Sequence, residues 1–258
     1  MIKFFRNIRK TLINQGKTTK YLNYAIGEIV LVVIGILIAL QINNWNETRK
    51  AKIKSRNYLI EIKSDLKADT ILFNTGIKHL NNYIADEEWV LNATDYTFKD
   101  ADRLWDCISG WYMPLSVNTR TFKEMQNQGS SKLVGFDALS EKINTYYTII
   151  KDETERAAAW EMKDVTERQI YLRDLEETIE ISNHRMKVWG VGLVKKSFPM
   201  RQDSITNSEL IISFAKSIRG RNHFKNNYVR HLRTINTVKI VTAEATELIK
   251  EIEKELQN

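Results

Sequence analysis

Residues 25–42 read AIGEIVLVVIGILIALQI, the one long apolar run in the chain, and residues 29–40 within it contain no polar side chain. Three aromatic residues flank the run: Tyr21, Tyr24 and Trp45. Residues 24–45 would rise by about 31 Å as an α-helix, which matches the roughly 30 Å core of a bilayer. Because Tyr and Trp concentrate at membrane interfaces, the run predicts a transmembrane helix over 24–45 with these three residues as interface anchors.

The net charge of +7 is concentrated around this run. Residues 1–46 hold six basic side chains and one acidic one, whereas the rest of the chain holds 33 basic and 31 acidic side chains. Residues 1–23 therefore read as a basic amphipathic juxtamembrane segment suited to anionic head groups. The nearly balanced remainder argues against a nucleic-acid-binding domain.

The flanking charges also predict an orientation. Six basic residues precede the span and five lie in 49–56 after it, a small bias that favours a cytoplasmic N-terminus. No small-residue cleavage site follows Leu40, so an uncleaved signal anchor is expected. We predict a single-pass protein of a bacterial inner membrane, with residues 46–258 in the periplasm.

One face of the span is suited to contact another helix. Glu28, Leu31, Gly35 and Ile38 share this face, and Gly35 with Ala39 forms a small-xxx-small pair that lets helices approach closely. These residues predict packing against a second copy or another membrane protein. Three roles are open to Glu28: its carboxylate could reach the head groups, make a polar contact between helices, or act as a proton site.

Beyond the span, the composition and periodicity predict an all-α fold. Only two prolines occur in the chain, and apolar residues recur at helical spacing. The sequence predicts an N-terminal transmembrane helix followed by an antiparallel helical bundle with long helices over 46–258. The expected helices are 47–91 (continuous with the span), one through Trp105 and Ile108, 119–128, 137–184, 206–217 and 223–256, with a turn at 219–221 and a loop or short strand at 188–199.

Charge is distributed unevenly along two of these helices. Residues 152–180 hold ten acids, whereas residues 210–243 hold seven bases and no acid. Either the two helices pack as complementary neighbours, or the basic stretch forms an anion- or lipid-binding surface. The candidate residues for either role are Arg219, Arg221, Lys225, Arg230 and Arg233.

The stretch KFFRNIRKTLINQGKTTKYLNYAIGEIVLVVIGILIALQINNWNE, together with Ile2 before it, resembles the N-terminal signature of a large family of Bacteroidota membrane proteins of unknown function. Residues 121–147, TFKEMQNQGSSKLVGFDALSEKINTYY, are similar to a second pattern of that family. The resemblance implies a single-pass anchor and a mostly helical domain. It supplies no catalytic residue, cofactor or substrate.

The sequence contains no recognised catalytic or nucleotide-binding motif. Glu180 and His184 have i, i+4 spacing but form a weak metal signal alone, and Cys107 reads as a buried small residue. We therefore expect no cofactor and no enzymatic activity. The favoured function is a membrane-anchored interaction, scaffold or sensor-like module of the cell envelope. The alternatives are an accessory subunit of a membrane complex, or an enzyme with a site among Trp105, Trp111, Arg120, Tyr146 and Tyr147.

Overall fold

The computed structural model describes residues 18–108, 112–130, 132–188 and 192–257. Over these residues the protein is all-α, with one short hairpin as its β structure, as the sequence predicts. Its contacts divide it into two units, residues 1–57 with 133–135, and residues 58–132 with 136–258. The predicted amphipathic segment at 1–23 lies mostly outside the described residues.

The first unit is built on the early part of helix α2, which runs from Thr18 to Asn92. Every residue from 29 to 45 is exposed, and the large apolar side chains from Ile29 to Ile42 are 47–64 % exposed. Among the described residues, α2 is the one helix long and apolar enough to cross a membrane, judged by length and composition. None of residues 29–45 is buried, whereas the apolar core helix of a soluble protein would be mostly buried.

The second unit contains the later part of α2 and the remaining elements. Two long helical segments dominate it. One is α5 (Asp137–Thr145), continued through a π-helical turn at Tyr146–Ile150 into α6 (Lys151–Glu176), and the other is α8 (Ile218–Gln257). Shorter elements connect them: a 3₁₀ turn at Phe98–Asp100, α3 (Ala101–Ile108), α4 (Arg120–Asn127), a 3₁₀ turn at Asn183–Arg185, the antiparallel pair β1 (Lys187–Val188) and β2 (Gly192–Leu193), and α7 (Ser204–Lys216).

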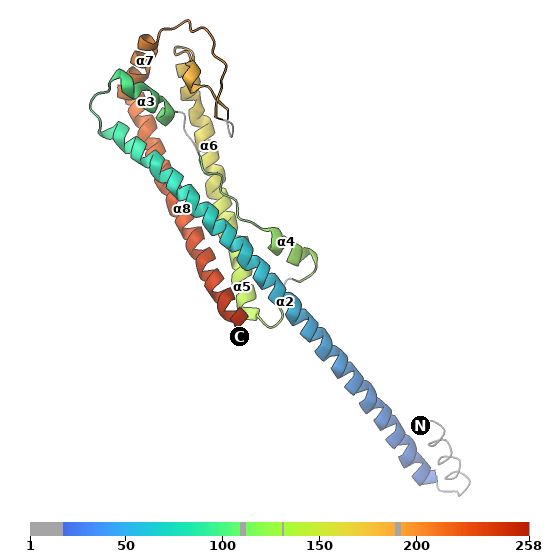
Figure 1. The fold of residues 1–258 in the computed structure, drawn as a ribbon. Coiled ribbons are helices and arrows are strands. Elements are labelled where there is room, and N and C mark those ends of the chain that lie inside the picture. Colours follow the sequence, from blue (N-terminus) through green and yellow to red (C-terminus); the bar gives the residue numbers. More distant parts are fainter. Residues whose placement is uncertain (1–17, 109–111, 131, 189–191, 258) are drawn as a thin grey trace. The chain divides into compact units, whose positions relative to one another are not determined.

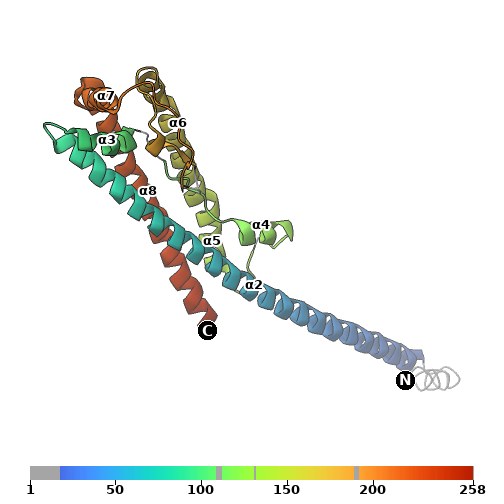
Figure 2. The ribbon, with the colours of Figure 1, turned by 45° about the horizontal axis from the view of Figure 1, so that its top comes forward.

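Helix α8 lies alongside both α2 and the α5–α6 segment and runs antiparallel to them (Figures 1 and 2). Cross-helix pairs show the direction: Lys67 with Glu253 and Glu88 with Tyr228 join α2 to α8, and Arg219 pairs with Asp174 on α6. The faces between these helices are apolar, with Leu66, Phe73, Leu80, Val238 and Val241 among the residues that are 0 % exposed. Their i, i+3/i+4/i+7 spacing is the reason why these segments fold as long helices.

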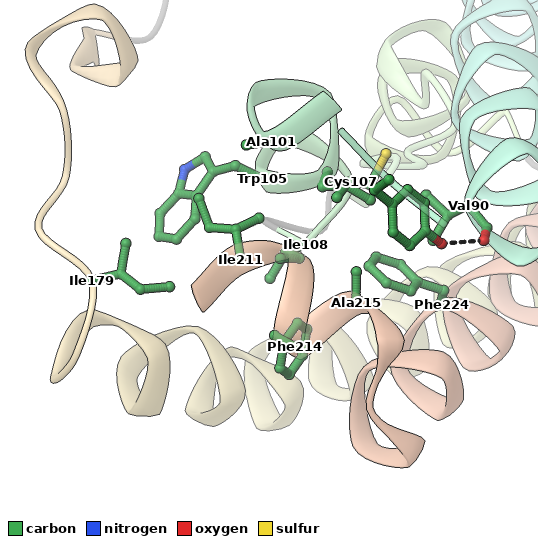
Figure 3. Packing of buried hydrophobic residues seen from close by; sticks show 12 residues of the cluster. Val90, Ala101, Trp105, Cys107, Ile108, Ile179, Ile211, Phe214, Ala215 and Phe224 are labelled. Carbon is green, nitrogen blue, oxygen red and sulfur yellow. Dashed lines mark hydrogen bonds between the residues drawn. The ribbon is translucent and has the colours of Figure 1, made fainter. Parts of the chain in front are cut away.

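A compact apolar core closes one end of this unit, where α3 and α7 meet α8 (Figures 1 and 3). Its buried residues come from the end of α2, from α3, from α7 with the start of α8, and from the loops that follow α2 and α6: Val90, Tyr96, Ala101, Leu104, Trp105, Cys107, Ile108, Ile179, Ile211, Phe214, Ala215 and Phe224. The Tyr96 hydroxyl donates a 2.6 Å hydrogen bond to the Val90 carbonyl (Figure 3).

Two predicted boundaries are wrong, and tertiary contacts explain both. The helix expected to reach residue 184 ends at Glu176, because Ile179 enters the core and the Glu180 N–H donates to the Gln202 and Asn207 side chains. The turn expected at 219–221 is helical. A Cβ on Gly220 would lie 2.0 Å from the Phe214 carbonyl oxygen, so this glycine permits close contact with the end of α7.

Candidate functional site

The basic residues predicted on α8 lie in different environments. The Arg219 side chain pairs with Asp174 and the Arg230 side chain with Glu161, both on α6. The Arg233 guanidinium lies 4.0 Å from the centroid of the Trp160 ring, also on α6. Arg221 donates a 2.7 Å hydrogen bond to the carbonyl of Leu91 at the end of α2, whereas Lys225 is exposed. Three of the five side chains therefore contact the acidic helix.

Arg230 belongs to a buried charge cluster, which we define as Glu87, Glu161, Arg230 and His231. The Arg230 Nη1 donates to Glu161 Oε1 at 2.8 Å, and Arg230 Nη2 lies 3.0 Å from His231 Nε2. The His231 Nδ1 lies 2.9 Å from Glu87 Oε1. The cluster thus connects α2, α6 and α8 through polar side chains alone.

The cluster is closed to solvent. The side chains of Arg230 and His231 are 1 % exposed, that of Glu161 is 2 % exposed and that of Glu87 is 3 % exposed. Isolated buried charges are strongly unfavourable, so such groups persist only when they are paired or neutralised. Asp65 and Asp69 are also buried in this unit, but the cluster is where charged side chains from α2, α6 and α8 meet.

The geometry assigns the tautomer of His231. A guanidinium has only donors, so the contact from Arg230 requires His231 Nε2 to act as an acceptor without a proton. In this arrangement the imidazole proton lies on Nδ1, which faces Glu87 Oε1 at 2.9 Å. The cluster consequently contains two carboxyl groups and one fixed cation.

Burial raises the pKa of both carboxyl groups in the cluster. For Glu87 the contact with His231 opposes this effect, and for Glu161 the contacts with Thr234 and Arg230 oppose it. Nearby, burial lowers the pKa of His223 to about 4, and its Nε2 lies 3.1 Å from the carbonyl oxygen of Ile108. His223 is therefore neutral at physiological pH.

The residues of the hypothetical enzyme site fall into two groups with different neighbours. Trp105 lies in the apolar core, with the Arg185 guanidinium 5.4 Å from its ring centroid. Arg120 instead pairs with Asp65 at 2.9 Å. Tyr146 and Tyr147 form an edge contact with each other. Trp111 lies outside the described residues. The described residues of this group therefore share no common site.

The second group has its own polar contacts. The buried Asp65 carboxylate accepts hydrogen bonds from the Thr121 N–H at 3.1 Å and from the Thr121 hydroxyl at 2.6 Å. Tyr147 stacks on Phe122 with ring centroids 4.5 Å apart. These contacts hold the first turn of α4 against α2 and the π-helical turn, so their role in the fold is structural.

The other candidate chemistry is dispersed. Glu180 accepts from the N–H groups of Arg201 and Gln202, whereas His184 Nε2 contacts Asp102, so the two do not share a metal. Among the described residues, no group of three His, Cys, Asp or Glu side chains could hold a metal ion. Burial raises the pKa of Cys107 to about 12, which leaves the thiol protonated and unreactive.

His184 does not complete a nucleophilic triad either. Its Nε2 lies 2.9 Å from Asp102 Oδ1 and 3.4 Å from Ser182 Oγ. A Ser–His–Asp triad uses opposite ring nitrogens for the acid and the nucleophile. Here both contacts involve the same nitrogen.

A groove of about 360 Å³ lies between α5 and α8, and four of its nine lining residues are glutamates. Two of these, Glu251 and Glu247, pair with Lys142 and Lys250 respectively. The charge of this groove is thus partly neutralised by the protein's own lysines.

No sequence signal separated Arg230 from the exposed arginines around it. Glu87, Glu161 and His231 were not singled out by sequence. These three residues occupy positions of their helices at which the 3–4-residue spacing otherwise places apolar side chains. Polar residues at such positions are expected to be buried, and this pattern could have indicated the cluster.

Comparison with known proteins adds one match. Residues 28–104 match the family described as "Family of unknown function (DUF6090)". The matched segment includes most of the candidate span, the rest of α2 and the first part of α3, less than a third of the chain. No curated protein and no solved structure matches the chain.

Proposed function

We propose that the protein is a membrane-anchored helical module of the cell envelope that acts through binding to other proteins and not through catalysis. The observation that carries the proposal is the exposure of every large apolar side chain from Ile29 to Ile42. Exposed apolar surface of this extent is unfavourable in water and favourable in a bilayer. The match to a family of unknown function over residues 28–104 is compatible with such a module.

In this proposal, Glu28, Leu31, Gly35, Ile38 and Ala39 form the contact with a second copy or a partner membrane protein. A Cβ on Gly35 would meet no atom within 4 Å, so this surface is open to a neighbouring helix. The membrane is the inner membrane of a bacterium, of the Bacteroidota by resemblance, with the C-terminal body in the periplasm. An accessory subunit of a larger membrane complex is the alternative, and it uses the same helix face.

Membrane extraction tests the anchor. The full chain should remain with the membrane fraction after alkaline carbonate and dissolve only in detergent. A variant with Ile34→Glu and Leu37→Glu should shift to the soluble fraction, because each charge near the centre of the span disfavours insertion by about 2.5–3.5 kcal/mol. The control places the same two changes at Ile60 and Ile71, which are exposed on the later part of α2. Release of the wild type by carbonate would refute the proposal.

Cysteine labelling tests the orientation. Cys107→Ser removes the one native thiol, and Lys254→Cys then places a reporter at an exposed position on α8. A membrane-impermeant maleimide that enters only the periplasm should label this cysteine in intact cells. Labelling that requires lysis would place the body in the cytoplasm and refute the orientation.

A further inference from the structure

The proton content of the buried charge cluster follows from its donors and acceptors. With His231 neutral, two ionised carboxylates and one guanidinium would leave one uncompensated negative charge in a site that is at most 3 % exposed. Burial of an unpaired charge is more costly than protonation of the group that carries it. One carboxyl group of the cluster should therefore hold a proton.

The contacts identify which carboxyl group this is. Glu161 pairs directly with the Arg230 guanidinium at 2.8 Å, which favours its ionised form. Glu87 contacts the His231 imidazole at 2.9 Å, and the charge of Arg230 lowers its pKa by less than burial raises it. The Oε2 atoms of Glu87 and Glu161 are both buried with no hydrogen-bond partner among the described residues, so the direct ion pair with Arg230 is what distinguishes Glu161. The adjacent Asp86 further opposes ionisation of Glu87.

We propose that the buried charge cluster holds one proton on Glu87 at neutral pH, and that loss of this proton as the pH rises weakens the attachment of α2 to α8. The proton passes to solvent during local opening and leaves the Glu87 carboxylate beside a neutral ring. The inference concerns the helical body alone and does not depend on the proposed membrane function.

Other titratable or charged groups surround the cluster on each neighbouring helix. They are Tyr83 and Asp86 on α2, Cys107 on α3, Asp164 and Arg168 on α6, and His223 and Tyr228 on α8. Tyr83 packs on the His231 ring with centroids 5.5 Å apart, and Asp164 pairs with Arg168 at 2.9 Å. Cys107 and His223 are both neutral near pH 7. None of these groups supplies the missing cation to Glu87.

The direction of the pH effect follows from linkage. The pKa of Glu87 is raised in the folded protein, so the folded state binds this proton more tightly than the unfolded state does. The resulting stabilisation is present below the pKa of a solvated glutamate and is lost as the pH rises through the raised value. Within that window the equilibrium constant for local opening should rise by about tenfold per pH unit, the dependence for one proton.

Hydrogen exchange of the full chain in detergent tests the proposal. Protection factors of residues 83–91 on α2 and 223–235 on α8 are measured from about pH 5 to about pH 9 and corrected for the intrinsic exchange rate. The wild type should lose protection with rising pH. Glu87→Gln, which keeps the shape but carries no titratable proton, should remove this dependence and should be better protected than the wild type at high pH. Glu255→Gln is the control, since Glu255 is an exposed glutamate on α8 that lies outside the cluster.

The opposite proton arrangement, with the proton on His231, predicts the opposite pH dependence of protection. If His231 were protonated and paired with an ionised Glu87, Glu87→Gln would lower protection at low pH and this difference would vanish at high pH. That result, or identical pH profiles for wild type and Glu87→Gln, would overturn the proposal.

Infrared spectroscopy of the wild type supplies a second measurement that needs no folded Glu87 variant. The spectrum at neutral pH should contain the C=O band of a buried protonated carboxylic acid, and the band should disappear at high pH. Because burial also raises the pKa of Asp69 to about 6, the same spectrum is recorded for Asp69→Asn. The band should persist in Asp69→Asn, and its absence from that variant at neutral pH would also overturn the proposal.

Discussion

The replacement Arg230→Met should destabilise the helical body strongly, and by an amount that depends on pH. Removal of the guanidinium leaves Glu161, 2 % exposed, without its cation, so this carboxyl group should also take up a proton. At pH 7, protonation of a glutamate whose ordinary pKa in water is 4.5 costs about 3.4 kcal/mol, because each pH unit corresponds to about 1.4 kcal/mol. This value falls within the roughly 3–5 kcal/mol expected for a broken buried pair.

The loss of stability caused by Arg230→Met should be smaller at lower pH, because protonation of Glu161 then costs less free energy. At pH 5 the same contribution is only about 0.7 kcal/mol, so the difference between Arg230→Met and the wild type should shrink by about 2.7 kcal/mol between pH 7 and pH 5. The free energy of opening of α8, obtained from hydrogen exchange of the full chain in detergent, measures this difference at each pH.

Two further variants separate charge from packing. Arg230→Met combined with Glu161→Gln leaves neither member of the pair charged and should recover most of the lost stability. Arg233→Met is the control, because Arg233 is exposed and contacts Trp160; it should cost no more than about 1 kcal/mol. The reasoning fails if Arg230→Met costs the same at both pH values, or costs no more than Arg233→Met.

Three other changes test separate parts of the structure. Gly220→Ala should destabilise the α7–α8 junction by more than about 2 kcal/mol, because the new Cβ would meet the Phe214 backbone. Gly76→Ala should cost much less stability, because its Cβ would meet only the movable end of the Met113 side chain. Equal thermal shifts for the two variants would contradict this account. Asp203→Ala should lower the free energy of unfolding by about 0.5–2 kcal/mol, because the Asp203 side chain accepts a 2.9 Å hydrogen bond from the Thr206 N–H at the start of α7. An unchanged midpoint of thermal denaturation would show that the cap is dispensable. Gly35→Leu should reduce the amount of crosslinked oligomer that the full chain forms in membranes, because the larger side chain would keep helices apart at Gly35. Gly27→Leu is the control, since Gly27 lies outside the proposed contact set. An unchanged crosslinking pattern for Gly35→Leu would exclude packing through Gly35.

The sequence determined the helical class and most helix positions because the evidence for both is local. The apolar run at 25–42 and the apolar residues at helical spacing in α2 and α8 are patterns within single segments, and helix formation depends mainly on such patterns. The exact start of a helix is harder to predict: the sequence predicts a helix over 206–217, whereas α7 begins at Ser204 with Asp203 as its cap. A cap depends on backbone geometry that neighbouring candidates compete to satisfy.

Only the tertiary structure decided which charged residues are buried. Arg230 and Arg233 are three residues apart on one helix, yet the first is 1 % exposed and the second is exposed against Trp160. Residue type and spacing do not distinguish them, because burial depends on where α2 and α6 contact α8. The same contacts bring Glu87, Glu161 and His231 together from distant parts of the sequence. The sequence by itself thus determined a helical chain with one membrane-like segment, whereas the packing of three helices determined its buried charge cluster, since desolvation is a property of neighbours in space.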